Sequence, residues 1–298
     1  MLVSFIVPFY KSESFISEAI ESVLDCGYSD FELYLINDGS PDNSQSICQQ
    51  YKDQFPGHIT ILQHELGLNK GVSASRKLGV EAARGDLIFF LDSDDVLMPG
   101  IVDKYVEIFK RSADIILIHG KIKLIGSTES LIDIENAFDL GPVEKQYVLA
   151  AEPYFLLENH ICNSTACFRK KSILGLDFSY EQAFQVEDWI LWTLFSERGR
   201  FCYFPEPVAK YRYHETSATH EVNSKGHMYY IFTRVELYMV LAAKIRDKNI
   251  KARVTQLLYD NLNMLYNTYS KGSRKRFAFS LPIISFVKDY IKSLIDRK

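Results

Sequence analysis

The sequence predicts an α/β protein with a mostly parallel, twisted sheet flanked by helices and followed by a C-terminal helical extension. Two observations support this prediction. Apolar runs typical of buried strands alternate with helical patterns, at intervals of about 30 residues, over residues 1–120. From about residue 222 the pattern is helical to the end, with interruptions at Gly272 and Pro282.

Four strands separated by three helices account for the first half of the chain. The strands are expected at residues 3–7, 31–36, 59–62 and 87–91. The helices are expected at residues 14–24, over about ten residues from Ser44, and at residues 69–83. Apolar residues at 15, 16, 19, 20, 23 and 24 have the spacing of one helix face. This alternation indicates a doubly wound, Rossmann-like sheet.

The pattern is less regular after the fourth strand. Helices are expected at residues 99–111 and 185–196, and strands at 114–119, 166–169, 201–204 and 208–213. Residues 120–150 are acidic and irregular, which predicts a loop or flap.

The charge is divided unevenly along the chain. Residues 1–221 hold 19 Lys+Arg and 33 Asp+Glu, a net charge of −14, whereas residues 222–298 carry +10. The basic part ends in Lys271–Arg276 followed by the apolar run Phe277–Val287, which is too short to span a bilayer. Three interpretations stay open for this region: packing on the rest of the chain, a homodimer through its helices, or peripheral membrane contact.

The cysteines and the start of the sequence predict a location. Five scattered cysteines without a C-x-x-C pair argue against a disulfide framework or a zinc site. Met1 leads directly into the first strand, without the features of a signal peptide. We expect a cytoplasmic protein, at most attached to the inner face of the cell membrane, with no nucleic-acid partner.

Two nucleotide-binding motifs are missing. No G-x-G-x-x-G follows the first strand and no G-x-x-x-x-G-K-[ST] occurs, which argues against a dinucleotide oxidoreductase and a P-loop NTPase.

Carboxylates follow the fourth strand, in the segment Asp92-Ser93-Asp94-Asp95. In an extended chain Asp92 and Asp94 point the same way, about 6–7 Å apart. Packed carboxylates repel unless a cation or ligand neutralises them, and hard oxygen ligands suit Mg²⁺ or Mn²⁺. The alternative is a solvated acidic turn.

Polar side chains also follow the other strands: Tyr10 the first, Asp38 the second, and Asn69 with Arg76 the third. Parallel strands end at one edge of the sheet, where ligands bind. Taken singly, each has an ordinary interpretation as a rim aromatic, a turn residue or a solvated helix residue. Their joint placement favours a nucleotide site.

Two later segments are candidates for chemistry. In Glu187-Asp188-Trp189 a carboxylate lies beside aromatic side chains, which suits a general base, although a favourable match to a helix dipole is the alternative. Arg212 and His214 alternate on one face and suit a diphosphate or its metal, although a lone histidine is more often structural.

The chain resembles the family 2 glycosyltransferases with a GT-A fold. The similarity covers about residues 1–217 and keeps the family's order of motifs. The matching segments are Val3–Tyr10, Ile36–Asp42, Asn69–Arg76, Leu91–Asp95 and Glu187–Trp189. The chain departs from the family pattern at Lys11, where Asn is frequent, and at Ser75-Arg76-Lys77, where Ala-Arg-Asn is frequent.

The resemblance implies a role for each matching residue. Pro8, Tyr10 and Asp38 would hold the uracil of a UDP-sugar, with Asn69, Arg76 and Ser93 lining the donor pocket and Asp92 near the ribose. Asp94, with His214, would ligate Mn²⁺ or Mg²⁺ on the diphosphate. Asp188 would be the catalytic base. Glu187, Trp189 and Arg212 would contact the diphosphate or the acceptor.

The resemblance also implies a reaction and a domain plan. The expected enzyme is an inverting transferase that moves a hexose or N-acetylhexosamine to a hydroxyl of a glycan, lipid-linked or protein-linked acceptor, in bacterial surface glycan synthesis. Residues 1–220 would form the catalytic domain, with a donor half at 1–120 and an acceptor half at 121–220, before a basic helical region at 221–298. Two alternatives remain: a non-catalytic module with the same fold, and a phosphatase of the haloacid-dehalogenase type.

Overall fold

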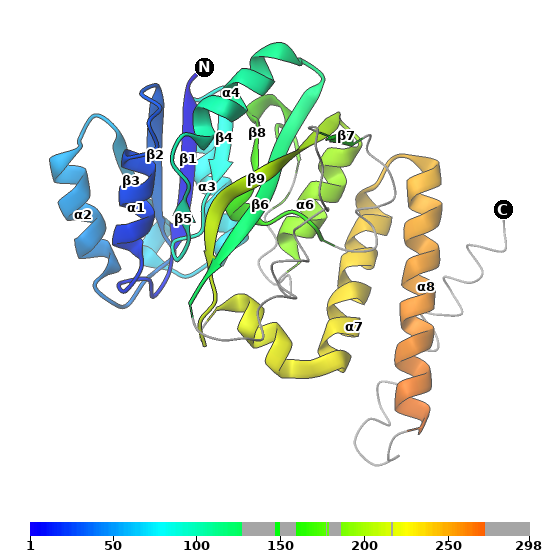
Figure 1. Ribbon diagram of the computed structural model, residues 1–298. Coiled ribbons are helices and arrows are strands. Elements are labelled where there is room, and N and C mark those ends of the chain that lie inside the picture. Colours follow the sequence, from blue (N-terminus) through cyan, green and yellow to red (C-terminus); the bar gives the residue numbers. More distant parts are fainter. Residues whose placement is uncertain (127–146, 150–158, 177, 179–185, 216, 272–298) are drawn as a thin grey trace. The chain divides into compact units, whose positions relative to one another are not determined.

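The computed structural model describes residues 1–126, 147–149, 159–176, 178, 186–215 and 217–271. The chain forms two compact units, which are described separately (Figure 1). The first comprises residues 1–182 and 198–214, and the second residues 183–197 and 215–298.

The described part of the first unit contains a nine-stranded sheet in the order β3-β2-β1-β4-β8-β6-β9-β5, with β7 pairing to β9. The strands in this order are Ile59–Gln63, Phe31–Asn37, Val3–Phe9, Leu87–Phe90, Cys167–Arg169, Ile115–Ile125, Arg200–Arg212 and Val96–Leu97, with β7 at Tyr147–Leu149. Strands β3, β2, β1 and β4 are parallel, whereas β8 is antiparallel to both β4 and β6. This confirms the predicted α/β class, with a parallel first half and a mixed second half.

Helices cover both faces of the parallel strands (Figure 1). Helices α1 (Ile16–Leu24) and α4 (Ile101–Arg111) share a core with Phe5 and Val7 of β1. Helix α3 (Val72–Ala82) lies on the opposite face, because a Cβ on its Gly79 would come within 2.5 Å of the Ile6 side chain. Helix α2 (Ser44–Gln54) packs beside β3 and α1. The carboxyl ends of the parallel strands therefore lie along one edge between two helical layers.

Two sequence-based expectations about the second half are corrected. Residues 120–125, expected in a loop, continue strand β6 because they pair in parallel with β9. The two strands expected at 201–204 and 208–213 are one strand, β9. Its register with β6 shifts after Gly120, where Lys121 pairs with Pro207, so the bulge accommodates the Pro205–Pro207 segment without ending the ladder. Most of the predicted flap lies outside the described residues.

The second unit contains helices α6 (Glu187–Ser196), α7 (Ala218–Lys244) and α8 (Lys248–Lys271). Helix α7 packs against both α6 and α8. Buried residues on these helices include Trp192, Tyr238, Leu241, Leu258 and Leu265. Ser217 caps α7 by accepting a hydrogen bond from His220 N.

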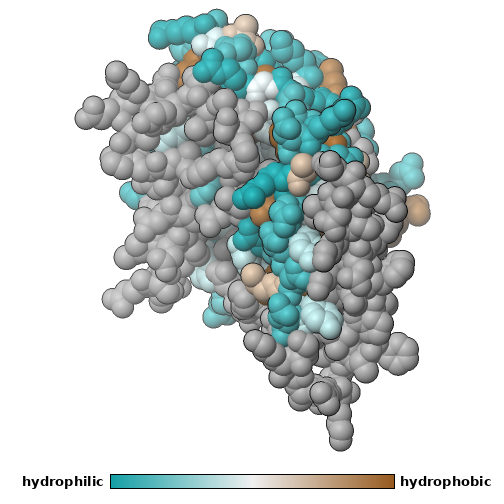
Figure 2. All heavy atoms as spheres, turned by 90° about the vertical axis from the view of Figure 1, so that its right-hand side faces the viewer, coloured by the Kyte–Doolittle hydropathy of each residue, from teal (hydrophilic) through white to brown (hydrophobic). Residues whose placement is uncertain are grey.

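The surface of the helical part is mostly polar on the face shown in Figure 2, where the described residues are largely hydrophilic with scattered apolar ones. Among the helices that the structure describes, none combines the length and the apolar composition needed to cross a bilayer. The predicted basic and apolar segment at 271–287 lies almost entirely outside the described residues.

Candidate active site

The acidic segment after β4 forms the centre of the candidate site in the first unit. Asp92 and Asp94 are partly exposed, at 29% and 28% of their side-chain surface. His214, which follows β9, places its Nε2 atom 3.0 Å from Oδ2 of Asp94. The structure therefore brings together a carboxylate and an imidazole that the sequence marked separately.

Asp95 points away from the solvent and ties the acidic segment to two other parts of the chain. Its carboxylate accepts hydrogen bonds from the Ser164 hydroxyl and from Arg212 N, the latter at 2.8 Å. Burial raises the pKa of Asp95 well above its usual range, and the charges of Asp94 and Asp92 raise it further. Asp95 is thus a buried anchor, and only its two acidic neighbours face the solvent.

Arg212 is held by groups of the protein itself. Its Nε donates to the carbonyl of Asp94 at 2.9 Å, and its guanidinium pairs with Glu18 at 2.8 Å. The same guanidinium lies over the Phe15 ring, which His214 also contacts at 4.8 Å between ring centroids. In this structure Arg212 braces the end of β9 against α1, and its predicted contact with a diphosphate stays a prediction.

Arg76 and Asp92 form a close ion pair, with 2.6 Å between Nη2 and Oδ1. Arg76 is only 4% exposed, and its guanidinium lies 5.5 Å from the centre of the Phe90 ring. The interpretation of Arg76 as a solvated helix residue is therefore wrong. The buried guanidinium of Arg76 therefore fixes the position of Oδ1 of Asp92.

Asp38 organises the loop that precedes α3. Its two oxygens accept hydrogen bonds from Lys70 N and Gly71 N, at 2.7 and 3.0 Å. The loop crosses directly over Gly39, where a Cβ would lie 2.6 Å from the carbonyl oxygen of Gly67. Asn69, carried by this loop, is exposed. Asp38 is 4% exposed, so its most evident role here is to position the loop that presents Asn69.

The end of β1 supplies an aromatic face and a serine link. Pro8 is buried within β1, whereas Tyr10 is 43% exposed, with the ammonium of Lys11 5.2 Å from its ring centre. Ser93 of the acidic segment shares a 2.7 Å hydrogen bond with Ser12. The loop after β1 is therefore tied directly to the acidic segment.

Five residues that support this arrangement were not predicted: Ser12, Phe15, Glu18, Asp95 and Ser164. The sequence shows Asp95 as the third carboxylate of its segment, but it does not predict that Asp95 is buried. No sequence signal distinguishes Ser164, which is fully buried, from the other serines of the chain.

Glu187, Asp188 and Trp189 belong to the second unit, at the start of α6. Asp188 is partly buried in the first turn of α6, and its Oδ1 accepts a hydrogen bond from Trp189 N at 2.6 Å. Trp189 is 6% exposed and lies under the Arg234 guanidinium of α7, at 5.7 Å. This contact fixes the first turn of α6 within its unit.

The Asp94–His214 pair fits a divalent cation that arrives with a nucleotide. Among the described residues no group of three or more His, Cys, Asp or Glu side chains is arranged to hold an ion. Mg²⁺ is often bound by one or two carboxylates together with substrate phosphates and water, and such a site needs no complete protein cage. One carboxylate and one imidazole suit this kind of shared coordination.

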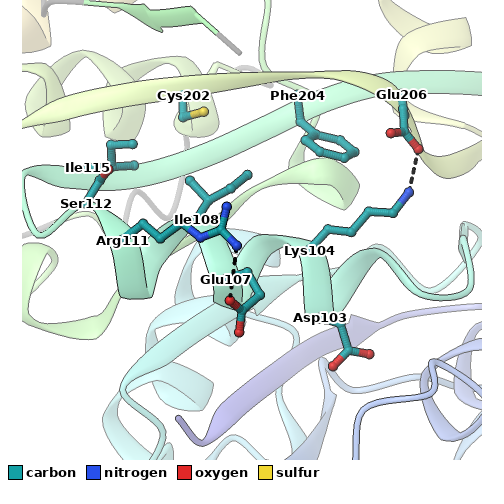
Figure 3. Close-up of a pocket in the computed structure, with 10 residues that line it drawn as sticks. All are labelled: Asp103, Lys104, Glu107, Ile108, Arg111, Ser112, Ile115, Cys202, Phe204 and Glu206. Carbon is teal, nitrogen blue, oxygen red and sulfur yellow. Dashed lines mark hydrogen bonds and ion pairs between the residues drawn. The ribbon is translucent and has the colours of Figure 1, made fainter. Parts of the chain in front are cut away.

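A groove of about 550 Å³ lies elsewhere in the first unit, between α4, β6 and β9 (Figure 3). Ile108, Ile115 and Phe204 line it, and Lys104 pairs with Glu206 at its rim. None of the predicted site residues lines this groove. This groove is therefore distinct from the candidate site.

The model of the family described as glycosyl transferase family 2 matches residues 4–173, more than half of the chain. The chain belongs to glycosyl transferase family 2. This confirms the family that the motifs predicted, and the alternative of a haloacid-dehalogenase-type phosphatase is dropped.

Relatives of this glycosyltransferase include proteins of teichoic acid synthesis. It is 28% identical over 224 residues to the minor teichoic acid biosynthesis protein GgaB of Bacillus subtilis, covering 72% of this chain and 23% of GgaB. It is 34% identical over 143 residues to GgaA of the same organism, covering 46% of this chain and 31% of GgaA. The chain thus spans less than a third of either relative.

The fold of this glycosyltransferase is similar to that of TarS from Staphylococcus aureus. Against the crystal structure of TarS residues 1–349 in complex with UDP-GlcNAc, the TM-score is 0.62 at 18% identity, covering 90% of this chain and 73% of that chain. This similarity shows the fold alone, and it confirms the predicted GT-A class.

Proposed function

We propose that this glycosyltransferase moves a hexose or N-acetylhexosamine from a UDP-sugar to a hydroxyl of a surface glycan, in polysaccharide synthesis of the teichoic acid kind. The observation that carries the proposal is the pairing of Asp94 with His214 at the carboxyl edge of the parallel sheet. The similarity to TarS, crystallised with UDP-GlcNAc, and to GgaB supports this choice of donor and product.

The donor half of the proposed site lies within residues 1–120, completed by the end of β9. Tyr10 offers an exposed ring for the uracil to stack on, beside the loop that Asp38 holds in place. Asp92, oriented by Arg76, faces the solvent and suits a ribose hydroxyl. These groups bind the nucleotide at the edge where open α/β sheets hold their ligands.

Asp94 and His214 would hold Mn²⁺ or Mg²⁺, which would supply positive charge for the leaving diphosphate. The chain's own groups position these two side chains: Arg212 Nε donates to the Asp94 carbonyl, and Phe15 packs against the His214 ring.

Asp188 is the proposed general base, which takes the proton of the acceptor hydroxyl as it attacks the anomeric carbon. A single displacement from the face opposite to the leaving group inverts that centre. Glu187 and Trp189, in the same helical turn, are proposed to contact the diphosphate or the acceptor. Trp189 and Arg234 hold the turn that carries Asp188.

The proposal keeps residues 1–220 as the catalytic domain and 221–298 as a basic helical region. A homodimer through the C-terminal helices and peripheral contact with the inner face of the membrane remain part of the proposal. Liposome sedimentation at low salt tests the membrane contact, and light scattering tests the dimer.

A thermal-shift panel of nucleotide sugars, run with Mn²⁺ and with a chelator, tests the donor class. We expect a UDP-sugar to raise the melting temperature with Mn²⁺ and to lose most of this effect with chelator. Equal stabilisation by GDP-sugars or CMP-sugars, or stabilisation that ignores the chelator, would contradict the proposal.

Replacement of the proposed base separates binding from transfer. Asp188→Asn is expected to lower sugar transfer by at least about 100-fold while leaving UDP-sugar binding unchanged, because a general base acts only in the chemical step. Asp260→Asn, which changes an exposed carboxylate on α8 of the same unit, is the matched control. Unchanged transfer by Asp188→Asn would remove the base assignment and leave the family unaffected.

A further inference from the structure

The acidic segment 92–95 is fastened from its buried side by contacts with two distant parts of the chain. Asp95 is 1% exposed and accepts hydrogen bonds from Ser164, 69 residues later, and from Arg212 N, 117 residues later. Ser164 Oγ in turn accepts from Asp92 N at 3.1 Å. The Asp95 carboxylate thus links the segment before β8 to the end of β9.

Arg212 is hydrogen-bonded to both Asp94 and Asp95. Arg212 N donates to the Asp95 carboxylate, and Arg212 Nε donates to the Asp94 carbonyl at 2.9 Å. His214 follows two residues later and reaches the Asp94 carboxylate from there. The distance between Asp94 and His214 is therefore set by where Arg212 is held.

We propose that Asp95 is a positioning residue, which through Ser164 and the Arg212 backbone sets the spacing of Asp94 and His214 and thereby the affinity for a divalent cation bound with UDP. This inference rests on the proposed function. It adds a residue that touches neither the nucleotide nor the ion.

The geometry favours positioning over direct binding. Asp95 is fully enclosed, and its two oxygens face Ser164 and Arg212 N, so no face of the carboxylate is left for a ligand. Asp94 and His214 lie just beyond the antiparallel pairing of Val96 with Lys210, and the contacts of Asp95 continue this link up to the two side chains. Supporting partners of metal ligands typically change metal affinity by about 10–100-fold when removed.

Two substitutions at Asp95 distinguish positioning from a requirement for charge. Asp95→Ala removes both acceptors and frees the Arg212 segment. Asp95→Asn keeps an oxygen for Arg212 N and places an amide beside the Ser164 oxygen. Ser164→Ala is a milder variant, which removes the hydrogen bond between Ser164 and Asp95 but keeps the one between Arg212 N and Asp95. It replaces Asp95→Ala in the test if that variant does not fold. Asp103→Asn, an exposed carboxylate on α4, is the control.

The readout is the affinity for Mn²⁺ in the presence of saturating UDP, followed by electron paramagnetic resonance, together with the affinity for uridine without metal. We expect Asp95→Ala to weaken Mn²⁺ binding by about 10–100-fold, Ser164→Ala to weaken it less, and Asp95→Asn to restore most of it. Uridine affinity should stay unchanged in all of them.

Unchanged Mn²⁺ affinity in both Asp95→Ala and Ser164→Ala would overturn the inference. An equal loss of uridine and Mn²⁺ binding would also overturn it, because it would mark a general structural defect. A wild-type protein in which UDP and Mn²⁺ do not bind together would instead refute the proposed function, and the inference with it.

Discussion

His214 Nε2 lies 3.0 Å from Asp94 Oδ2, although 120 residues separate the two side chains along the chain. The contact joins the end of β9 to the segment after β4. Arg212 and Asp95 hold the two segments in this register, and the Phe15 ring lies behind the imidazole. The pair is the point at which these two segments meet in the proposed donor site.

Removal of the imidazole should weaken metal binding more than nucleotide binding. For His214→Gln we expect the Mn²⁺ affinity measured with UDP to fall by about tenfold or more, because one of two protein ligands is lost. Affinity for uridine alone should not change. His58→Gln is a suitable control, since His58 is exposed before β3 and stacks on Phe31. Identical Mn²⁺ affinities in the two variants would contradict a ligand role for His214.

Gly39→Ala should disturb the loop before α3, which Asp38 holds, more than it disturbs the fold. Gly39 has a φ of +71°, and an added Cβ would lie 2.6 Å from Gly67 O and 2.8 Å from Asn69 N. Both the strained backbone and the clash push the loop away from Asp38. We expect weaker uridine and UDP binding with a modest drop in melting temperature. Gly57→Ala is the control, because its Cβ would meet no atom within 4 Å. Equal UDP affinity in both variants would show that the loop does not contribute.

Arg76 and Asp92 should be strongly coupled in their contributions to the free energy of unfolding. Arg76→Met is expected to cost about 1.5–3 kcal/mol of unfolding free energy, since it removes a hydrogen bond to a charged group and leaves Asp92 without its buried cation. The cost should shrink when Asp92→Asn is already present, and a double-mutant cycle in urea measures this. The exposed pair of Arg200 and Asp114, which are 2.8 Å apart, should show little coupling. Similar coupling in both cycles would contradict the special status of the buried pair.

His119 should make the stability of the first unit depend on pH. Burial lowers the pKa of His119 to about 3, and the neighbouring His160 acts in the same direction. The unfolded chain therefore binds a proton at His119 below about pH 6.5 while the folded chain does not. The resulting loss of stability as pH falls from 6.5 is about 1.4 kcal/mol per pH unit.

His119→Phe should remove this contribution. The ring nitrogens of His119 have no hydrogen-bond partner among the described residues, and its ring packs beside Tyr203, so a phenyl ring keeps the packing without the titration. Urea unfolding at pH 7.5 and at pH 5.0 gives the comparison. We expect the variant to lose less stability than the wild type between these two values. Parallel losses would show that His119 is protonated in the folded state.

The parallel half of the fold follows from the sequence because its strands are short, mostly apolar and followed by polar residues. Such runs as Leu87–Leu91 have few alternatives to a buried strand, and their polar ends must then meet at one sheet edge. The second half was harder to predict. The strands expected at 201–204 and 208–213 are separated by Pro205 and Pro207, but a bulge lets β9 continue past them.

The supporting contacts of the site were not predictable, because they join residues far apart that carry no local signal. Arg76 follows the pattern of a surface helix residue, and only the position of Asp92 above it makes its burial favourable. Ser164 pairs with Asp95 because η4 (Asn163–Thr165) packs beside β4 and β6, a tertiary contact without a motif. The residues proposed to face the donor follow a motif in the sequence, whereas the residues that position them do not.

The central claim is that Asp94 binds UDP through a divalent cation. Calorimetric titration of UDP into the wild type and into Asp94→Asn, each with Mn²⁺ and with chelator, tests it most directly. We predict that chelator weakens UDP binding to the wild type, that Asp94→Asn weakens it similarly, and that chelator has little further effect on the variant. An Asp94→Asn protein that binds UDP as tightly as the wild type and keeps the full dependence on Mn²⁺ would contradict the account.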